Sequence, residues 1–245
     1  MAKVLVSDAL AAEGLEVLRQ AQGLEVVDRP GMPPAELLEA IADAEGLVIR
    51  SGTKVTADVI AAAKQLRVIG RAGIGVDNVA VDAATERGIA VLNTPEGNNI
   101  TTAEHAIALM VSLARHIPQA SASMKAGRWD KKKYQGMELY NRTLGVVGLG
   151  NIGRLVARRG KALGMKVLTC DPFVSAEAAA KLDVELVSLD ELLRASDVVT
   201  VHVPRNKETI GLLDTAAFEK MGTGVLVINA ARGGIVDEDA LLEAL

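Results

Sequence analysis

The chain of 245 residues alternates short apolar runs with longer segments in which apolar residues recur every three or four positions. The short runs are typical of buried strands, and the longer spacing is typical of amphipathic helices. In the first part, strands are predicted at Lys3–Ser7, Leu24–Asp28, Gly46–Arg50, Arg67–Gly70 and Ala90–Asn93. Helices are predicted between them at Ala11–Gln20, Pro33–Ala42 and Ala57–Lys64. This alternation predicts a parallel sheet with right-handed crossovers.

The alternation is interrupted at Asn93–Asn99, where turn residues replace the apolar pattern. A long helix is predicted from about Thr101 to Ala114, and a polar, basic segment from Lys125 to Lys133 leads to a second series. Strands of that series are predicted at Thr143–Val147, Lys166–Cys170, Val184–Leu186, Val198–Val201 and Gly224–Asn229, with a final helix at Asp237–Leu245. We therefore expect two α/β domains, at residues 1–97 and 98–245.

A glycine motif, Gly148-Leu149-Gly150-Asn151-Ile152-Gly153, directly follows the strand Thr143–Val147 and opens a helix. In this context the spacing indicates a dinucleotide site, because the glycines permit a tight turn, an approaching pyrophosphate and close packing of helix on strand. Asp171 stands about 20 residues on, at the end of the next strand, where a carboxylate accepts hydrogen bonds from ribose hydroxyls. A 2′-phosphate would be repelled there, so NAD is favoured over NADP.

A second group, Asn229–Asp237, lies at the carboxyl end of the last predicted strand, where open α/β sheets bind ligands. Its Arg232 could hold a carboxylate and a neighbouring carbonyl through two parallel hydrogen bonds and polarise the carbonyl toward hydride. From spacing alone, an arginine that binds backbone carbonyls is an equal alternative.

Two further strand ends carry arginines beside glycines, in Gly70–Asn78 and Arg50–Lys54. Backbone amides in such turns can face an anion, and with Arg50 and Arg71 they indicate an anionic substrate. Ordinary surface arginines are the alternative for each. Of the three histidines, His105 and His116 lie on the predicted long helix and are expected to pack or face solvent, and His202 is expected to be structural or beside the cofactor.

Composition narrows the class of protein. The formal net charge of −4 is spread over interspersed acidic and basic residues, which argues against a nucleic-acid partner. The single cysteine, Cys170, excludes an intrachain disulfide and a cysteine-rich zinc site. The first apolar run ends at Asp8, and no run approaches the ~20 residues that cross a bilayer. We expect a cytoplasmic protein without a membrane partner or a metal.

These motifs, together with Asn93-Thr94-Pro95, Asp171-Pro172 and Val201-His202-Val203-Pro204, resemble the D-isomer-specific 2-hydroxyacid dehydrogenases over the whole chain. The resemblance implies that Arg232 is the catalytic arginine and that the substrate is a small, phosphorylated 2-hydroxy acid. It implies substrate contacts from Arg50, Ser51, Arg71 and Gly73. It implies NAD contacts from Gly148, Gly150, Asn151, Ile152, Gly153, Asp171, Val203, Ala230 and Ile74.

The resemblance also implies a fold: a flavodoxin-like substrate domain and a Rossmann-type NAD domain, with the active site in the cleft between them and a homo-oligomer, at least a dimer, formed through the segment that ends at Trp129. It places the general acid–base histidine and glutamate, and a sixth strand, after Leu245, so both domains are expected to be incomplete. Two alternatives stay open: a sibling such as a glyoxylate or hydroxypyruvate reductase, and a non-catalytic NAD-sensing protein like the corepressors of this family.

Overall fold

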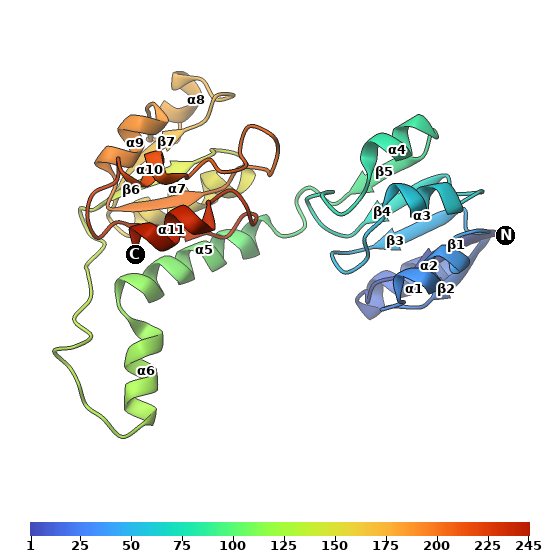
Figure 1. Cartoon of the computed structure of the whole chain (residues 1–245), viewed down its shortest axis with the longest axis horizontal. Helices are drawn as coiled ribbons and strands as arrows, with labels where there is room; N and C mark the ends of the chain where they lie inside the picture. The colour runs from blue at the N-terminus through green and yellow to red at the C-terminus, as the bar shows by residue number, and fades with distance from the viewer. The chain divides into compact units, whose positions relative to one another are not determined.

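The computed structural model describes residues 1–245 and divides into two compact units, Met1–Asn98 and Asn99–Leu245 (Figure 1). The first unit has a five-stranded sheet in the order β2-β1-β3-β4-β5, and every neighbouring pair is parallel. This is the flavodoxin-like order that the resemblance implied. The strands are β1 (Ala2–Val6), β2 (Leu24–Asp28), β3 (Gly46–Ile49), β4 (Val68–Arg71) and β5 (Ala90–Asn93).

The helices of the first unit are α1 (Ala12–Gln20), α2 (Pro34–Ala40), α3 (Ala57–Ala62) and α4 (Val81–Glu86). Its core forms between strand residues such as Leu5, Leu47 and Ile69 and the buried side chains of α2, α3 and α4, whereas α1 has no buried residue. Helix α4 was not predicted, because only Ala84 of its six residues is buried and no apolar spacing marks it.

The second unit contains another five-stranded parallel sheet, in the order β10-β9-β6-β7-β8. Counted from β6, this is the strand order of a Rossmann-type sheet, as the resemblance implied. Its strands are β6 (Thr143–Val147), β7 (Lys166–Cys170), β8 (Glu185–Leu186), β9 (Val198–Val201) and β10 (Leu226–Asn229). Its helices are α5 (Asn99–Ala114), α6 (Ile117–Lys125), α7 (Asn151–Ala162), α8 (Ala176–Ala180), α9 (Leu189–Ala195), α10 (Thr215–Phe218) and α11 (Glu238–Ala244).

Helices cover both faces of this sheet. On one face α5 and α7 pack together, and the small buried side chains of Ala103 and Ala106 let them approach closely over Leu144 and Val146. On the other face α9 and α10 pack on a separate cluster that includes Val199. The residues of β9 are buried on both faces, as expected of a central parallel strand.

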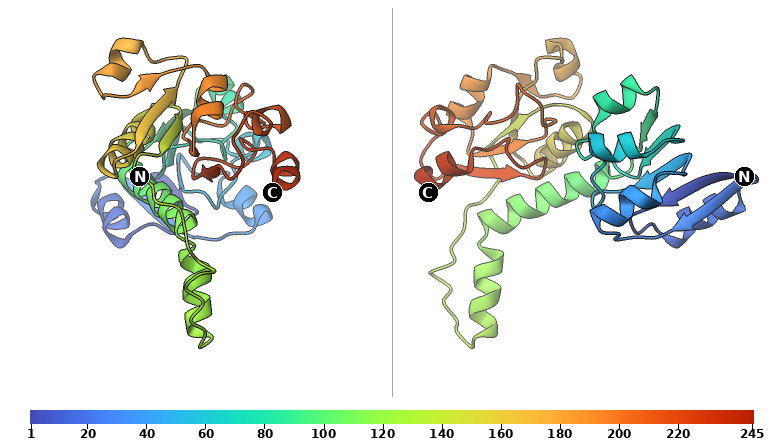
Figure 2. Two further views of the ribbon diagram at one scale, coloured as in Figure 1. Left: turned by 90° about the vertical axis from the view of Figure 1, so that its left-hand side faces the viewer. Right: turned by 45° about the vertical axis from the view of Figure 1, so that its right-hand side comes forward.

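Helix α6 and the segment after it extend away from the rest of the second unit (Figure 2). This helix was not predicted, because few of its side chains are buried and no single apolar stripe marks it; His116 precedes it in a left-handed conformation. Ile117, Met124 and Trp129 are exposed on this segment, for which the resemblance implied a subunit contact. No helix of the structure is both long and apolar enough to cross a membrane.

Several predicted boundaries were wrong by one or two residues, among them those of the long helix and of two strands in the second unit. The long helix begins at Asn99 rather than near Thr101. The last strand begins at Leu226, because Gly224 has a φ of 81° and cannot continue an extended strand in that direction. The short strand β8 pairs with β7 only through Glu185 and Leu186.

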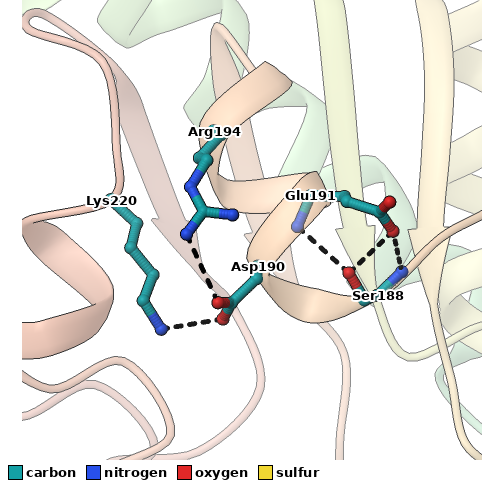
Figure 3. Close-up of polar contacts among 5 residues, drawn as sticks. All are labelled: Ser188, Asp190, Glu191, Arg194 and Lys220. Atoms are coloured by element: carbon teal, nitrogen blue, oxygen red, sulfur yellow. Dashed lines mark hydrogen bonds and ion pairs between the residues drawn. The ribbon is translucent and has the colours of Figure 1, made fainter.

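Helix α9 begins with a capping box at Ser188 (Figure 3). The Ser188 hydroxyl accepts a hydrogen bond from the Glu191 backbone N–H at 3.2 Å, and the Glu191 carboxylate accepts from the Ser188 backbone N–H at 2.9 Å. Hydrogen bonds from Ser188 lower the pKa of Glu191, and Lys220 similarly lowers the pKa of Asp190. The helix N-terminus is thus satisfied without burial.

We expect Ser188→Ala to lower the free energy of unfolding by about 1 kcal/mol at neutral pH, because the cap of α9 is lost. Since the folded pKa of Glu191 is depressed, its share of this stabilisation is present above the ordinary pKa of 4.5 and is lost as the pH falls. Urea unfolding at pH 7 and at about pH 3 measures both effects. A loss as large at low pH as at pH 7 would contradict the role of Glu191, and Ser121→Ala in α6 is the control.

Candidate functional site

Parallel pairing brings the carboxyl ends of four strands to one edge of the second unit. Val147 of β6 pairs with Cys170 of β7 and with Val201 of β9, and Val201 also pairs with Asn229 of β10. The residues that follow these four positions therefore lie along the same edge. They are Gly148, Asp171, His202 and Ala230.

The glycine turn is held against this edge by close backbone contacts. Gly148 has a φ of 91°, and a Cβ there would lie 2.9 Å from the His202 carbonyl oxygen. A Cβ on Gly153 would lie only 2.0 Å from the Gly148 carbonyl oxygen, so α7 can pack at this distance only through glycine. At Gly150, by contrast, a Cβ would meet no atom within 4 Å. The turn is thus packed tightly against the protein at Gly148 and Gly153, and it borders open space at Gly150.

Helix α7 begins at Asn151, directly after Gly150, and no side chain caps its N-terminus. The N–H groups of its first turn, which includes Ile152, therefore remain available to an anion, and the helix dipole favours negative charge there. Open space at Gly150 and uncapped N–H groups beside it fit the pyrophosphate of a dinucleotide.

Asp171 connects the second strand to the glycine turn. One oxygen, Oδ2, accepts a hydrogen bond from the Leu149 backbone N–H at 2.7 Å, and Oδ1 accepts one from the Phe173 backbone N–H at 2.9 Å. The side chain is half-buried. Because each carboxylate oxygen can accept two hydrogen bonds, both keep capacity for the hydroxyls of a ribose.

Two side chains near Asp171 stay neutral: Cys170, the last residue of β7, and His202, which directly follows β9. Burial, and then the charge of Asp171, raises the pKa of the Cys170 thiol. Burial lowers the pKa of His202 to about 4. The His202 Nε2 lies 2.9 Å from the Thr200 hydroxyl oxygen, and Nδ1 is buried without a hydrogen-bond partner. An imidazole with so low a pKa is a weak base at neutral pH, so His202 is unsuited to general base catalysis.

The loop after β10 presents Arg232. The Asn229 side chain organises this loop, because its Nδ2 donates to the Arg232 carbonyl oxygen at 2.9 Å and its Oδ1 accepts from the Ala231 backbone N–H at 3.1 Å. The guanidinium donates to the Ala231 carbonyl oxygen at 2.8 Å. Gly234, with a φ of 79°, provides the turn that follows. Val203 and Ala230 are half-buried near the ends of β9 and β10.

The predicted substrate residues meet at the carboxyl edge of the first unit. Ile49 of β3 pairs with Arg71 of β4, so the loop that starts at Arg50 lies beside the loop that starts at Ala72. The Arg50 Nη1 donates to the Ala9 carbonyl oxygen at 3.4 Å, and the Arg71 Nε donates to the Asn78 Oδ1 at 2.9 Å. Both acceptors are neutral oxygens, and neither guanidinium forms a salt bridge in the structure.

Gly73 fits closely under the arginine that precedes it. A Cβ there would lie 2.4 Å from the Arg71 Nη1. The next residue, Ile74, accepts a hydrogen bond from the Asn93 side chain through its carbonyl oxygen at 2.7 Å. Ser51 is exposed in the neighbouring loop. The sequence thus indicated which residues share this edge, but it missed Asp8 and Asn78 as the side chains that connect the loops.

The second unit matches a family model. Residues 107–245 match the NAD-binding domain of D-isomer specific 2-hydroxyacid dehydrogenases. The chain belongs to the D-isomer-specific 2-hydroxyacid dehydrogenase family. Members of this family are NAD-dependent oxidoreductases, so the glycine turn, α7 and Asp171 lie in an NAD-binding domain.

Known relatives in this family include D-3-phosphoglycerate dehydrogenases. The chain is 57% identical to the one from Archaeoglobus fulgidus over 99% of its own length and 46% of that relative. It is 50% identical to the one from Rattus norvegicus over 99% of its length and 45% of that relative. The chain thus spans about half the length of these curated relatives.

Solved structures of the same family are similar over the whole chain. A D-lactate dehydrogenase from Aquifex aeolicus, complexed with NAD and lactic acid, has a TM-score of 0.87 and 30% identity, over 99% of this chain and 72% of that one. A glyoxylate reductase from Paecilomyes thermophila has a TM-score of 0.89 and 32% identity, over 100% and 77%. These comparisons confirm the fold class and the cofactor expected from the sequence.

The different surroundings of the glycines predict different effects of an added methyl group. We expect Gly150→Ala to weaken NAD binding by at least about tenfold while the melting temperature stays near that of the wild type, because the Cβ enters only open space. Gly153→Ala should instead lower the melting temperature, because the Cβ would meet the Gly148 carbonyl oxygen. Fluorescence titration with NADH and thermal unfolding measure the two effects. Equal loss of stability in both variants would refute the distinction.

Asp171→Asn tests the ribose assignment with little change in shape. An amide oxygen can still accept from the Leu149 N–H, but the negative charge that repels a 2′-phosphate is removed. The preference for NAD over NADP, measured as a ratio of dissociation constants, should fall by at least about tenfold. Asp171→Ala should also destabilise the chain, since the buried Leu149 N–H loses its acceptor at a cost of about 1–3 kcal/mol. An unchanged preference in both variants would remove Asp171 from the ribose site.

Proposed function

We propose that the protein oxidises 3-phosphoglycerate to 3-phosphohydroxypyruvate with NAD, the reaction that opens L-serine biosynthesis. The observation that carries this proposal is the pair of guanidinium groups, Arg50 and Arg71, on adjacent loops of the first unit and hydrogen-bonded there to neutral oxygens. A substrate with both a phosphate and a carboxylate suits such a site. The identity of 47–57% to D-3-phosphoglycerate dehydrogenases supports the same assignment.

Arg232 is assigned the catalytic role in this proposal. A guanidinium can bind the substrate carboxylate and the oxygen on C2 through two parallel N–H groups, which fixes the orientation of C2. In the oxidation, its positive charge stabilises the negative charge that develops on the C2 oxygen. In the reverse direction, the same charge draws electrons from the carbonyl and so favours addition of the hydride. The hydrogen bonds of Asn229 keep the backbone of Arg232 in place. Ser51 and Gly73 are assigned to the substrate site with Arg50 and Arg71.

NAD, when bound, would supply the acceptor for the hydride from C2, and the hydroxyl proton would pass to the general acid–base histidine that the family resemblance implies. On this proposal the pyrophosphate is bound by N–H groups at the N-terminus of α7, over Gly148, Gly150 and Gly153, where Asn151 and Ile152 begin the helix. Asp171 binds the adenosine ribose hydroxyls. Contacts from Val203, Ala230 and Ile74 to the cofactor are carried over from the family resemblance. The cofactor residues of the second unit share one sheet edge.

A sibling activity is the second candidate, because a glyoxylate reductase of 32% identity has the same fold over the whole chain. Glyoxylate has no phosphate, so that activity would not require two arginines on adjacent loops of the first unit. The higher identity to D-3-phosphoglycerate dehydrogenases favours the phosphorylated substrate. Comparing kcat/KM for 3-phosphohydroxypyruvate and for hydroxypyruvate, which differ only by the phosphate, separates the two functions.

Arg232→Ala in the complete protein should lower kcat/KM for 3-phosphoglycerate by about 10²–10³, because the oriented positive charge at the reacting oxygen is lost. Arg232→Lys should recover only part of this loss, since an ammonium lacks the planar pair of donors. The dissociation constant for NADH should stay within about twofold of the wild type. Arg194→Ala on α9 is the matched control and should change neither quantity. Near-normal turnover by Arg232→Ala would remove the central catalytic assignment.

A further inference from the structure

Asp8 lies under the loop that carries Arg50 and binds its backbone. It follows β1 by two positions, and its Oδ2 accepts hydrogen bonds from the backbone N–H groups of Arg50 at 2.6 Å and Thr53 at 3.0 Å. The Thr53 hydroxyl donates to Oδ1 at 3.0 Å. A Cβ on Gly52 would lie 2.7 Å from the same Oδ1, so the carboxylate fits directly beneath the loop. Charge-assisted bonds of this kind are about twice as strong as neutral ones.

Asn78 binds the same loop from its carbonyl side and connects it to Arg71. Both hydrogens of Nδ2 are used, toward the carbonyl oxygens of Arg50 and Thr53, each at 2.7 Å. The remaining polar atom, Oδ1, accepts from the Arg71 Nε at 2.9 Å. One side-chain amide therefore fixes two neighbouring loops relative to each other. Its backbone adds a fourth bond, because its carbonyl oxygen accepts from the Val55 N–H at 2.8 Å.

These bonds determine which groups of the loop face outward. The N–H and C=O groups of Arg50 and Thr53 all point inward to Asp8 and Asn78. Ser51 and Gly52 are exposed, their backbone amides donate to no acceptor in the structure, and Ser51 directly follows Arg50 in the chain. Successive free N–H groups next to a cation are suited to an anion.

We propose that Asp8 and Asn78 are positioning residues of the substrate site: together they hold the Arg50–Thr53 loop and Arg71 in the one arrangement that binds the anionic substrate. The inference rests on the proposed function, since it takes these loops as the substrate site. It goes beyond that function by assigning substrate affinity to two side chains that act through the loops.

The two possible effects of Asp8 on an anion have opposite signs, which makes the proposal testable. A carboxylate near the site repels an anionic substrate, so electrostatics alone predicts that Asp8→Asn tightens substrate binding. Positioning predicts weaker binding, because an amide cannot accept the three hydrogen bonds that the carboxylate now accepts from the loop. Asn78→Ala removes the bonds from the carbonyl side without any change of charge.

The experiment compares wild type, Asp8→Asn, Asn78→Ala and the control Asp28→Asn in the complete protein. Asp28 also ends a strand of this sheet but binds only the Arg19 side chain, at 3.3 Å. For Asp8→Asn and Asn78→Ala, KM for 3-phosphoglycerate should rise at least about tenfold, while KM for NAD stays within about twofold. Exchange of the Arg50 and Thr53 amide hydrogens should accelerate in Asp8→Asn, with the amides of β6 unchanged. The control should match the wild type in all three quantities.

A KM for 3-phosphoglycerate that is unchanged or lower in Asp8→Asn would overturn the inference, even if the loop amides exchange faster. If Asp8→Asn does not fold, Thr53→Val removes the hydroxyl that bonds to Asp8 at 3.0 Å and to the Ser7 hydroxyl at 2.8 Å, and it should raise KM by a smaller factor. An unchanged KM in Thr53→Val would also overturn the inference.

The inference and the proposed function fail in different ways. A wild type that ignores 3-phosphoglycerate but reduces glyoxylate or hydroxypyruvate refutes the proposed substrate, and the variants are then compared with that acid; a higher KM for it still supports the positioning role. A wild type that turns over 3-phosphoglycerate, with variants of equal KM, refutes only the positioning role. A protein that binds NADH and turns over none of these acids overturns both.

Discussion

The parallel register of each sheet is the constraint on which the sites depend. In the second unit, Val147, Cys170, Val201 and Asn229 are aligned across four strands, so the groups that follow them are brought within reach of one another. The parallel backbone pairing of β6 with β7 and β9, and of β9 with β10, gives this alignment, and all four residues of β9 are buried within the sheet. A shift of one residue would separate the Asp171 carboxylate from the Leu149 N–H, which it now meets at 2.7 Å.

Five strands have the predicted bounds: Leu24–Asp28, Ala90–Asn93, Thr143–Val147, Lys166–Cys170 and Val198–Val201. A short apolar run identifies such a strand without reference to the rest of the chain, whether the strand is central and buried, as β9 is, or at the edge and largely exposed, as β5 is. Helices α4 and α6 were missed for the converse reason. Few of their residues are buried, so tertiary contacts leave no periodic pattern in the sequence.

Some residues of the candidate site could be predicted from the local sequence, and others could not. The glycine turn could be predicted, because each of its requirements is local: a φ of 91° at Gly148, and a helix that starts two residues before Gly153 and packs on the turn. The roles of Asp8 and Asn78 could not be predicted in this way. The bond of Asp8 to the Arg50 N–H joins residues 42 positions apart, and the bond of Asn78 to the Arg50 carbonyl joins residues 28 positions apart. Their only local signal is a polar residue after a strand end, which many surface residues share.

Asp8 and Asp171 make the same kind of hydrogen bond in the two units, but the bonds serve different functions. Each follows a parallel strand, and each carboxylate accepts backbone N–H groups of the loop that leaves the neighbouring strand. Asp171 is bonded by one N–H at each oxygen and keeps free lone pairs, so it suits direct contact with neutral hydroxyls and opposes a 2′-phosphate. Asp8 lies beneath the loop, with Gly52 against one oxygen. In that position its carboxylate accepts hydrogen bonds from the Arg50 and Thr53 amides, so on our proposal it favours an anion only indirectly, by holding the loop in which the Ser51 and Gly52 amides remain unbonded.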